Sequence, residues 1–127
     1  MVSRALLLIS SALPLCLCSG TARSHHSIGG EFDTETVTVN GIVSELRLIN
    51  PHAFILVDVE ADGKTEQWVL TMGPATKLIR GSGWTPDILQ PGNKISATGR
   101  AAREGKGMYI VELIKEDGTA LISSLEE

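Results

Sequence analysis

The sequence predicts a mostly β domain, and more specifically a small OB-like barrel of five strands with one short helix between the third and fourth strands. From Glu35 onward, short runs of alternating apolar residues are separated by glycine turns, and no long run has helical periodicity. The 127 residues suffice for one compact domain and not for two. An open sandwich of the same strands is the competing architecture.

The first half of the domain is expected to form a bent strand followed by a hairpin. The first strand spans residues 36–49, and a change of apolar phase next to Gly41 predicts a bulge that bends it. Asn50-Pro51 ends this strand because proline has no N–H for a central ladder. Residues 53–60 are apolar on both faces, so we expect a strand covered on both sides. Asp62-Gly63 predicts the hairpin turn.

The return strand and the helix come next. The return strand is expected over residues 65–72. Pro74 suits the first turn of a helix over 75–80, which Gly81 is expected to end. A second short turn is expected to start at Thr85-Pro86.

Two further strands complete the predicted barrel. They cover residues 94–99 and 108–114, joined by the glycine-rich loop 103–107. Asp117-Gly118 then turns the chain into a last short strand at 120–121. Closure into a barrel would remove exposed sheet edges, which suits a β protein without disulfides.

Residues 1–22 have the layout of a secretory signal peptide. Arg4 precedes an apolar stretch, Ala5–Cys18, and small residues follow it. The stretch has 14 residues, whereas a transmembrane helix needs roughly 20, so we expect no membrane span in the mature protein. The expected location is the periplasm.

Two cleavage positions satisfy the small-residue rule, one after Ala22 and one after Ser24. Cleavage would leave an N-terminal arm, 23–35, ahead of the barrel domain, 36–127. Both cysteines fall within the signal peptide, and lipoprotein anchoring through Cys18 is disfavoured because a leucine precedes it. After cleavage at the first position, the mature chain has 105 residues, a net charge of −5 and no cysteine.

Composition excludes several function classes. The net charge is −4 and only five residues are aromatic, so neither a phosphate-tracking surface nor a stacking platform for nucleic acid is expected. The sequence contains no Gly-x-Ser-x-Gly elbow and no phosphate-binding glycine loop, and the mature chain has no cysteine. We therefore expect a non-enzymatic protein.

Histidines near the new N-terminus form the first candidate site. If cleavage follows Ala22, His25 is the third residue, and the amine, two backbone amides and its ring offer the square-planar nitrogen set that Cu(II) favours. If cleavage follows Ser24, the amine and ring of His25 chelate together and His52 supplies a further nitrogen. We therefore assign His25, His26 and His52 to a possible copper site. The alternative is that His25 and His26 are polar residues of a frayed arm.

Two other elements allow a functional and a structural interpretation. His52 follows Asn50-Pro51, where it could complete a site or simply bond to the backbone of a turn, and the structural interpretation is favoured. Arg80 and Trp84 could form a ligand groove, with the arginine binding an anion and the indole stacking. The alternative is that Trp84 plugs the barrel end and Arg80 lies near a helix C-terminus.

Short motifs are spread over nearly the whole mature chain. They are His25-His26-Ser27, Glu31-Phe32-Asp33, Gly41 with Val43, Asn50-Pro51-His52, Trp68, Leu78 with Arg80, Gly83-Trp84, Leu89 with Pro91-Gly92, Gly99 and Asp117-Gly118. Together these motifs resemble a family of small exported bacterial proteins known only as a domain of unknown function. The resemblance implies a periplasmic, β-barrel-like domain and no established activity.

Two functional hypotheses remain open on the sequence. The first is a non-enzymatic periplasmic binding module that takes up Cu(II) or a similar ion through its N-terminus and histidines. The second is a protein-interaction module of the cell envelope without a metal role. The expected partner is an unknown envelope protein or a small ligand, and not nucleic acid.

Overall fold

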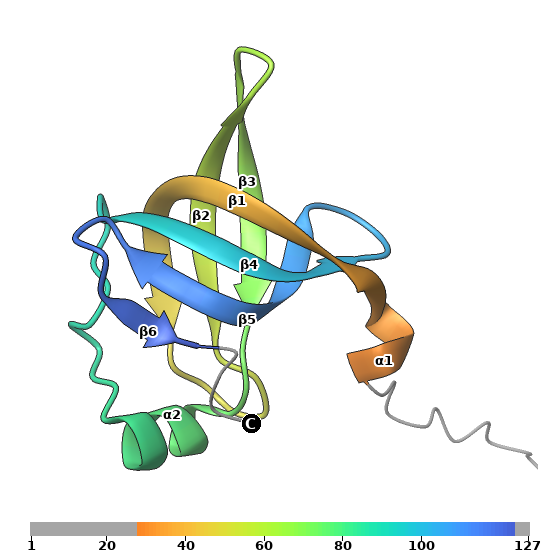
Figure 1. Ribbon diagram of the computed structural model, residues 1–127. Coiled ribbons are helices and arrows are strands. Elements are labelled where there is room, and N and C mark those ends of the chain that lie inside the picture. The colour runs from red at the N-terminus through yellow and green to blue at the C-terminus, as the bar shows by residue number, and fades with distance from the viewer. Residues whose placement is uncertain (1–27, 124–127) are drawn as a thin grey trace, which may run out of the picture.

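The computed structural model describes residues 28–123, which form six strands and two helices in one mostly β unit (Figure 1). The mostly β prediction is therefore confirmed. The elements are α1 (Ile28–Glu31), β1 (Phe32–Arg47), β2 (Phe54–Ala61), β3 (Lys64–Thr71), α2 (Ala75–Ser82), β4 (Lys94–Ala102), β5 (Gly107–Lys115) and β6 (Ala120–Ile122). In this part of the chain, no helix has the length and apolarity needed to cross a bilayer.

All six strands belong to one sheet, with the order β3-β2-β1-β4-β5-β6. Neighbours in this order are antiparallel, and β3 also pairs in parallel with β5, from Val69 opposite Gly107 to Thr71 opposite Tyr109. This pairing joins the two sides of the sheet and closes five strands into a ring. A sandwich of two separate sheets is not observed.

Strand β1 is long and bent, and it changes partner along its length. Its first half pairs with β4 and its second half with β2, and Ile42 pairs with both. The bulge predicted from the change of apolar phase is present, because the register with β2 shifts between Val43 and Glu45, two residues past Gly41. At Gly41, a Cβ would overlap the Val57 side chain and lie 2.6 Å from the Asp58 carbonyl oxygen. The glycine therefore permits a close crossing of β1 over β2.

The two faces of β2 differ in burial. Ile55 and Val57 are fully buried, whereas Phe54, Leu56 and Asp58 on the other face are half-buried. The prediction that both faces would be covered is wrong, because the structure places no second layer of described residues over the outer face. Buried and half-buried side chains therefore alternate along β2, as in a strand with one covered face.

The predicted turns are confirmed, with one shift at the helix end. Asp62 and Gly63 both have positive φ, 51° and 75°, as a two-residue hairpin turn requires. Helix α2 continues through the expected end at Gly81 to Ser82, and Gly83 takes the left-handed conformation with φ 68°. At Thr85-Pro86 the structure has a turn and no helix, with the Ile88 N–H donating to the Thr85 carbonyl.

Strand ends also differ from the expected limits. Strand β1 begins at Phe32, because this residue pairs with Ala102 at the end of an extended β4. The last turn holds β5 and β6 together. There the backbone N–H of Thr119 donates to the Asp117 carboxylate at 2.9 Å, and this bond lowers the pKa of Asp117 below its usual value.

The buried core fills the ring and extends beneath it. Strand residues and residues of the α2 region belong to one apolar cluster, so α2 and the segment after it cover one end of the ring (Figure 1). The α2 region contributes Met72, Leu78, Trp84 and Leu89. The outward sides of β1, β2 and β3 remain uncovered and include exposed apolar residues.

Candidate functional site

Outward side chains of β1, β2 and β3 form an open surface, which we call the outer strand face. In the strand register, Leu56 lies opposite Val69 on one side and Glu45 on the other. Val69 is 42% exposed, and Leu56 is half-buried. The outer strand face consists of Ile42, Glu45, Arg47, Phe54, Leu56, Asp58, Gln67, Val69 and Thr71. Neighbouring exposed apolar side chains of this kind mark a surface suited to a ligand or partner.

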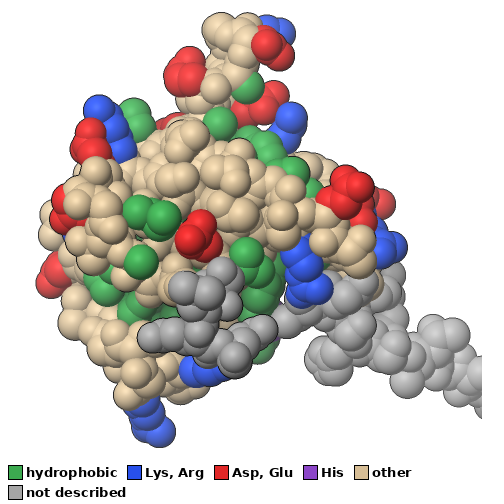
Figure 2. All heavy atoms as spheres, viewed as in Figure 1, with side chains coloured by type: hydrophobic (Ala, Val, Ile, Leu, Met, Phe, Trp, Pro, Cys, Tyr) green, Lys and Arg blue, Asp and Glu red, His purple; other side chains and the backbone are tan. Residues whose placement is uncertain are grey.

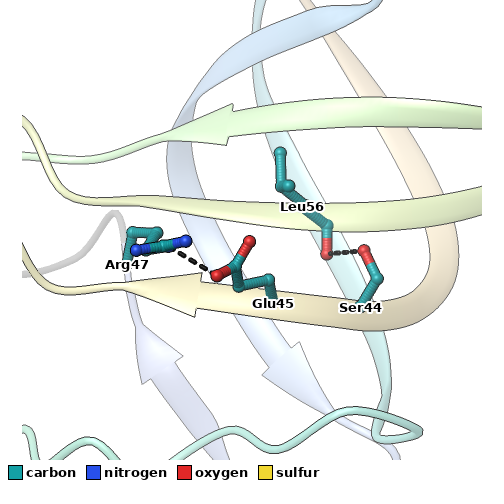
Figure 3. Close-up of polar contacts among 4 residues, drawn as sticks. All are labelled: Ser44, Glu45, Arg47 and Leu56. Carbon is teal, nitrogen blue, oxygen red and sulfur yellow. Dashed lines mark hydrogen bonds and ion pairs between the residues drawn. The ribbon is translucent and has the colours of Figure 1, made fainter.

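Polar contacts hold the β1 side of this face. The Ser44 hydroxyl, at the bulge, donates to the Leu56 carbonyl at 3.0 Å, and Glu45 forms an ion pair with Arg47 (Figure 3). Both charged side chains are about half exposed, at 41% and 57%, so the pair adds little to stability. The Glu45–Arg47 pair instead places one negative and one positive charge along the β1 edge of the outer strand face.

A hollow adjoins the outer strand face at Ile42. Its volume is about 520 Å³, within the usual range for small-molecule sites, and it lies across β1, β2, β4 and β5. The side chains around Ile42 include Asp58 and Lys94, its partners on both sides. The mixture of charges and the open shape give no preference for one ligand charge.

The predicted histidine site is described only in part. His25 and His26 lie outside residues 28–123. His52 is exposed in the β1–β2 loop, and its Nδ1 lies 3.3 Å from the Met72 carbonyl oxygen. If Nδ1 carries the proton and donates it to that carbonyl, Nε2 keeps its lone pair for a ligand. Within residues 28–123, no three His, Cys, Asp or Glu side chains come together as a metal site.

The start of β1 and the backbone next to His52 both lie near Tyr109. The Phe32 and Tyr109 rings meet edge to face, with centroids 5.8 Å apart. A Cβ on Gly73 would lie 3.9 Å from the Tyr109 hydroxyl oxygen, and Gly73 directly follows Met72. The Tyr109 side chain therefore lies between Phe32 and the backbone that follows β3, where the Met72 carbonyl approaches His52.

The ligand groove expected from Arg80 and Trp84 is not present. Trp84 is only 2% exposed and belongs to the core, so its ring has no open face for stacking. Arg80 is exposed in the last turn of α2, where a cation is favourable. The structure thus matches the alternative, in which Trp84 plugs one end of the strand ring.

Sequence reasoning missed the outer strand face. Alternation in the return strand already placed Val69 opposite in direction to Leu70, and this was the available signal. The pattern could not show that the Val69 side would stay uncovered, because that depends on how β1, β2 and β3 curve together.

The fold and the site define a small mostly β domain with a ring of five strands and an open apolar face. Residues 13–110 match the model of a family of unknown function (DUF6152), and the chain belongs to this family. The match confirms the resemblance to an uncharacterised family inferred from the sequence motifs. No curated protein matches the chain.

Proposed function

We propose that this chain is a non-enzymatic periplasmic binding module built on an OB-like barrel, and that its outer strand face binds a segment of another envelope protein. The closed ring of five strands in the order β1-β2-β3-β5-β4 supports the OB-like assignment. The OB fold binds its ligands on the face of its second and third strands, which supports the choice of the outer strand face as the binding surface. The signal-peptide layout of residues 1–22 supports export.

The observation that carries this proposal is the uncovered pair of Leu56 and Val69 on neighbouring strands. An apolar segment of a protein partner could pack on this pair, while its polar groups meet Glu45 and Arg47 at the edge. Nucleic acid, the usual ligand of such a face, is disfavoured by the net charge of −4.

A photocrosslinking residue tests the outer strand face directly. With p-benzoylphenylalanine in place of Val69, we expect one discrete adduct in intact cells, and we expect Leu56→Asp to abolish it. The matched control carries the same residue at Thr36, which is exposed on the half of β1 that pairs with β4. Equal adducts at both positions would show that the labelling reflects exposure alone and would contradict the proposal.

A second candidate function is Cu(II) binding through the mature N-terminus, with His25, His26 and His52. The orientation of the His52 ring by the Met72 carbonyl favours it, since such a bond is typical of metal-ligating histidines. Phe32, at the start of β1, and Gly73, which follows Met72, both lie near Tyr109, so the N-terminal arm joins the domain next to the tyrosine that Gly73 also approaches.

Copper titration of the correctly processed protein tests this second candidate. We expect one equivalent of Cu(II) to give a visible d–d band, and His52→Ala to weaken binding about tenfold or more, because a ligand is lost. The control is the same chain with extra residues ahead of the natural N-terminus, which blocks the free amine. If wild type gives no band, or if the extended chain binds equally well, the copper role is rejected and the outer strand face is unaffected.

A further inference from the structure

We propose that the end of the molecule formed by the β1–β2 loop and α2 binds the surface of an anionic lipid bilayer. We call this region, residues 48–53 and 72–84, the basic end. The proposal concerns a different surface from the outer strand face and goes beyond the proposed binding of an envelope protein.

Charge separates the two ends of the molecule. The basic end contains Lys77 and Arg80 and no acidic residue, although the whole chain has 15 acidic residues against 11 basic ones. The β2–β3 hairpin projects from the opposite end (Figure 1), and its residues 58–67 include four carboxylates and one lysine. On the face shown in Figure 2, basic and no acidic side chains are visible at the lower end. An anionic surface would therefore orient the molecule with α2 toward it.

Exposed apolar side chains accompany these cations. Ile49 and Ile79 are each 47% exposed and are the two most exposed of the large apolar side chains among residues 30–123. The Ala75 N–H donates to the Ile49 carbonyl at 3.1 Å, and the Thr76 N–H donates to Asn50 Oδ1 at 3.3 Å. The loop is thus bonded to the first turn of α2, and Ile79 follows Thr76 by about one turn.

The opposite side of α2 is fixed in the core. Ala75 and Leu78 are 4% and 9% exposed, and both face inward, whereas Thr76, Lys77, Ile79 and Arg80 are exposed. Core packing therefore holds Ile79 and the two cations outward without a change of conformation. The end is preorganised for a flat surface.

Together these features favour a lipid surface over the other anionic partners. Cations near a bilayer interact with phosphate headgroups, while neighbouring isoleucines can enter the headgroup and acyl boundary. A purely acidic protein segment would use Lys77 and Arg80 and would leave both isoleucines without a role. The combination of exposed isoleucine and cation is the chemistry of an anionic bilayer.

Vesicle cosedimentation of the processed protein tests the proposal. We expect binding to vesicles of phosphatidylglycerol and phosphatidylethanolamine, weakened by salt, and little binding to phosphatidylcholine. Lys77→Glu with Arg80→Glu is expected to reduce binding at least tenfold, and Ile49→Ser with Ile79→Ser severalfold. All four positions are exposed, and thermal unfolding followed by circular dichroism checks that each variant is folded.

The matched control makes the same types of change at other surfaces. Lys64→Glu with Ile42→Ser alters an exposed lysine and an isoleucine that is 45% exposed, and it should leave vesicle binding unchanged. An equal loss in this control, or no binding of wild type to phosphatidylglycerol vesicles, overturns the proposal. If the charge reversals weaken vesicle binding and the serine variants bind normally, the isoleucines do not enter the bilayer, and the argument that favours a lipid surface over an acidic macromolecule is overturned. Val69→Asp should keep vesicle binding, which separates this result from the outer strand face.

Discussion

Gly99→Ala is expected to destabilise the domain by about 3 kcal/mol or more, measured by urea unfolding. A Cβ at this position would overlap the Tyr109 carbonyl oxygen and lie 2.9 Å from its carbonyl carbon and 3.0 Å from Ile110 Cα. All three atoms belong to the backbone of β5, which pairs with both β4 and β3 at this level. The strand cannot move away without losing ladder hydrogen bonds, so the overlap cannot be relieved by a side-chain rotation.

Gly81→Ala is the matched control for this substitution. Gly81 has no heavy atom within 4 Å of its added Cβ and lies in the last turns of α2. Alanine there should leave the unfolding free energy unchanged or raise it by about 0.5–1 kcal/mol, because glycine is unfavourable within a helix. A Gly99→Ala protein as stable as wild type would contradict the close approach of β4 and β5.

Trp84→Ala is expected to lower the unfolding free energy by about 3–5 kcal/mol, because it removes the largest fully buried side chain of the described core. The indole packs beneath the strand ring with Met72, Leu78 and Leu89, so its loss leaves a cavity at that end. For a domain of this size, the thermal midpoint should fall by roughly 15 °C or more. Circular dichroism measures the change.

Two comparisons separate a plug from a binding residue. Trp84→Phe should recover part of the stability, since a smaller ring still fills part of the space. Ile79→Ala, at a position 47% exposed, should change the unfolding free energy by less than about 0.5 kcal/mol. An unchanged thermal midpoint in Trp84→Ala would contradict the burial of the indole in the core.

Local signals predicted most of the strands and turns. The alternating run at 94–99 became part of β4, and Asp62-Gly63 formed the hairpin turn, because both depend on residues adjacent in the chain. Sequence patterns did not give the features that depend on pairing with residues far along the chain. The start of β1 at Phe32 requires its partner Ala102, and the exact site of the bulge, between Val43 and Glu45, depends on the pairing of β1 with β2.

The candidate surfaces were less accessible to sequence reasoning. His52 stood out as a single residue, but its bond to Met72 joins positions 20 residues apart. Leu56 and Val69 become a shared apolar surface only after β2 and β3 pair. Likewise, Ile49 and Ile79 belong to one end only because the β1–β2 loop is bonded to the first turn of α2.

The sequence by itself determined the β character of this domain, its turns, and the positions of its charges and histidines, because alternation and turn chemistry act over a few residues. Only the tertiary structure decided which strand faces are covered. The parallel pairing of Val69 with Gly107 closes the ring across 38 residues of chain, and this closure buries one side of each strand and leaves the other open. The same closure places the acidic hairpin and the basic end at opposite ends of the molecule (Figure 1), a separation that no local pattern encodes.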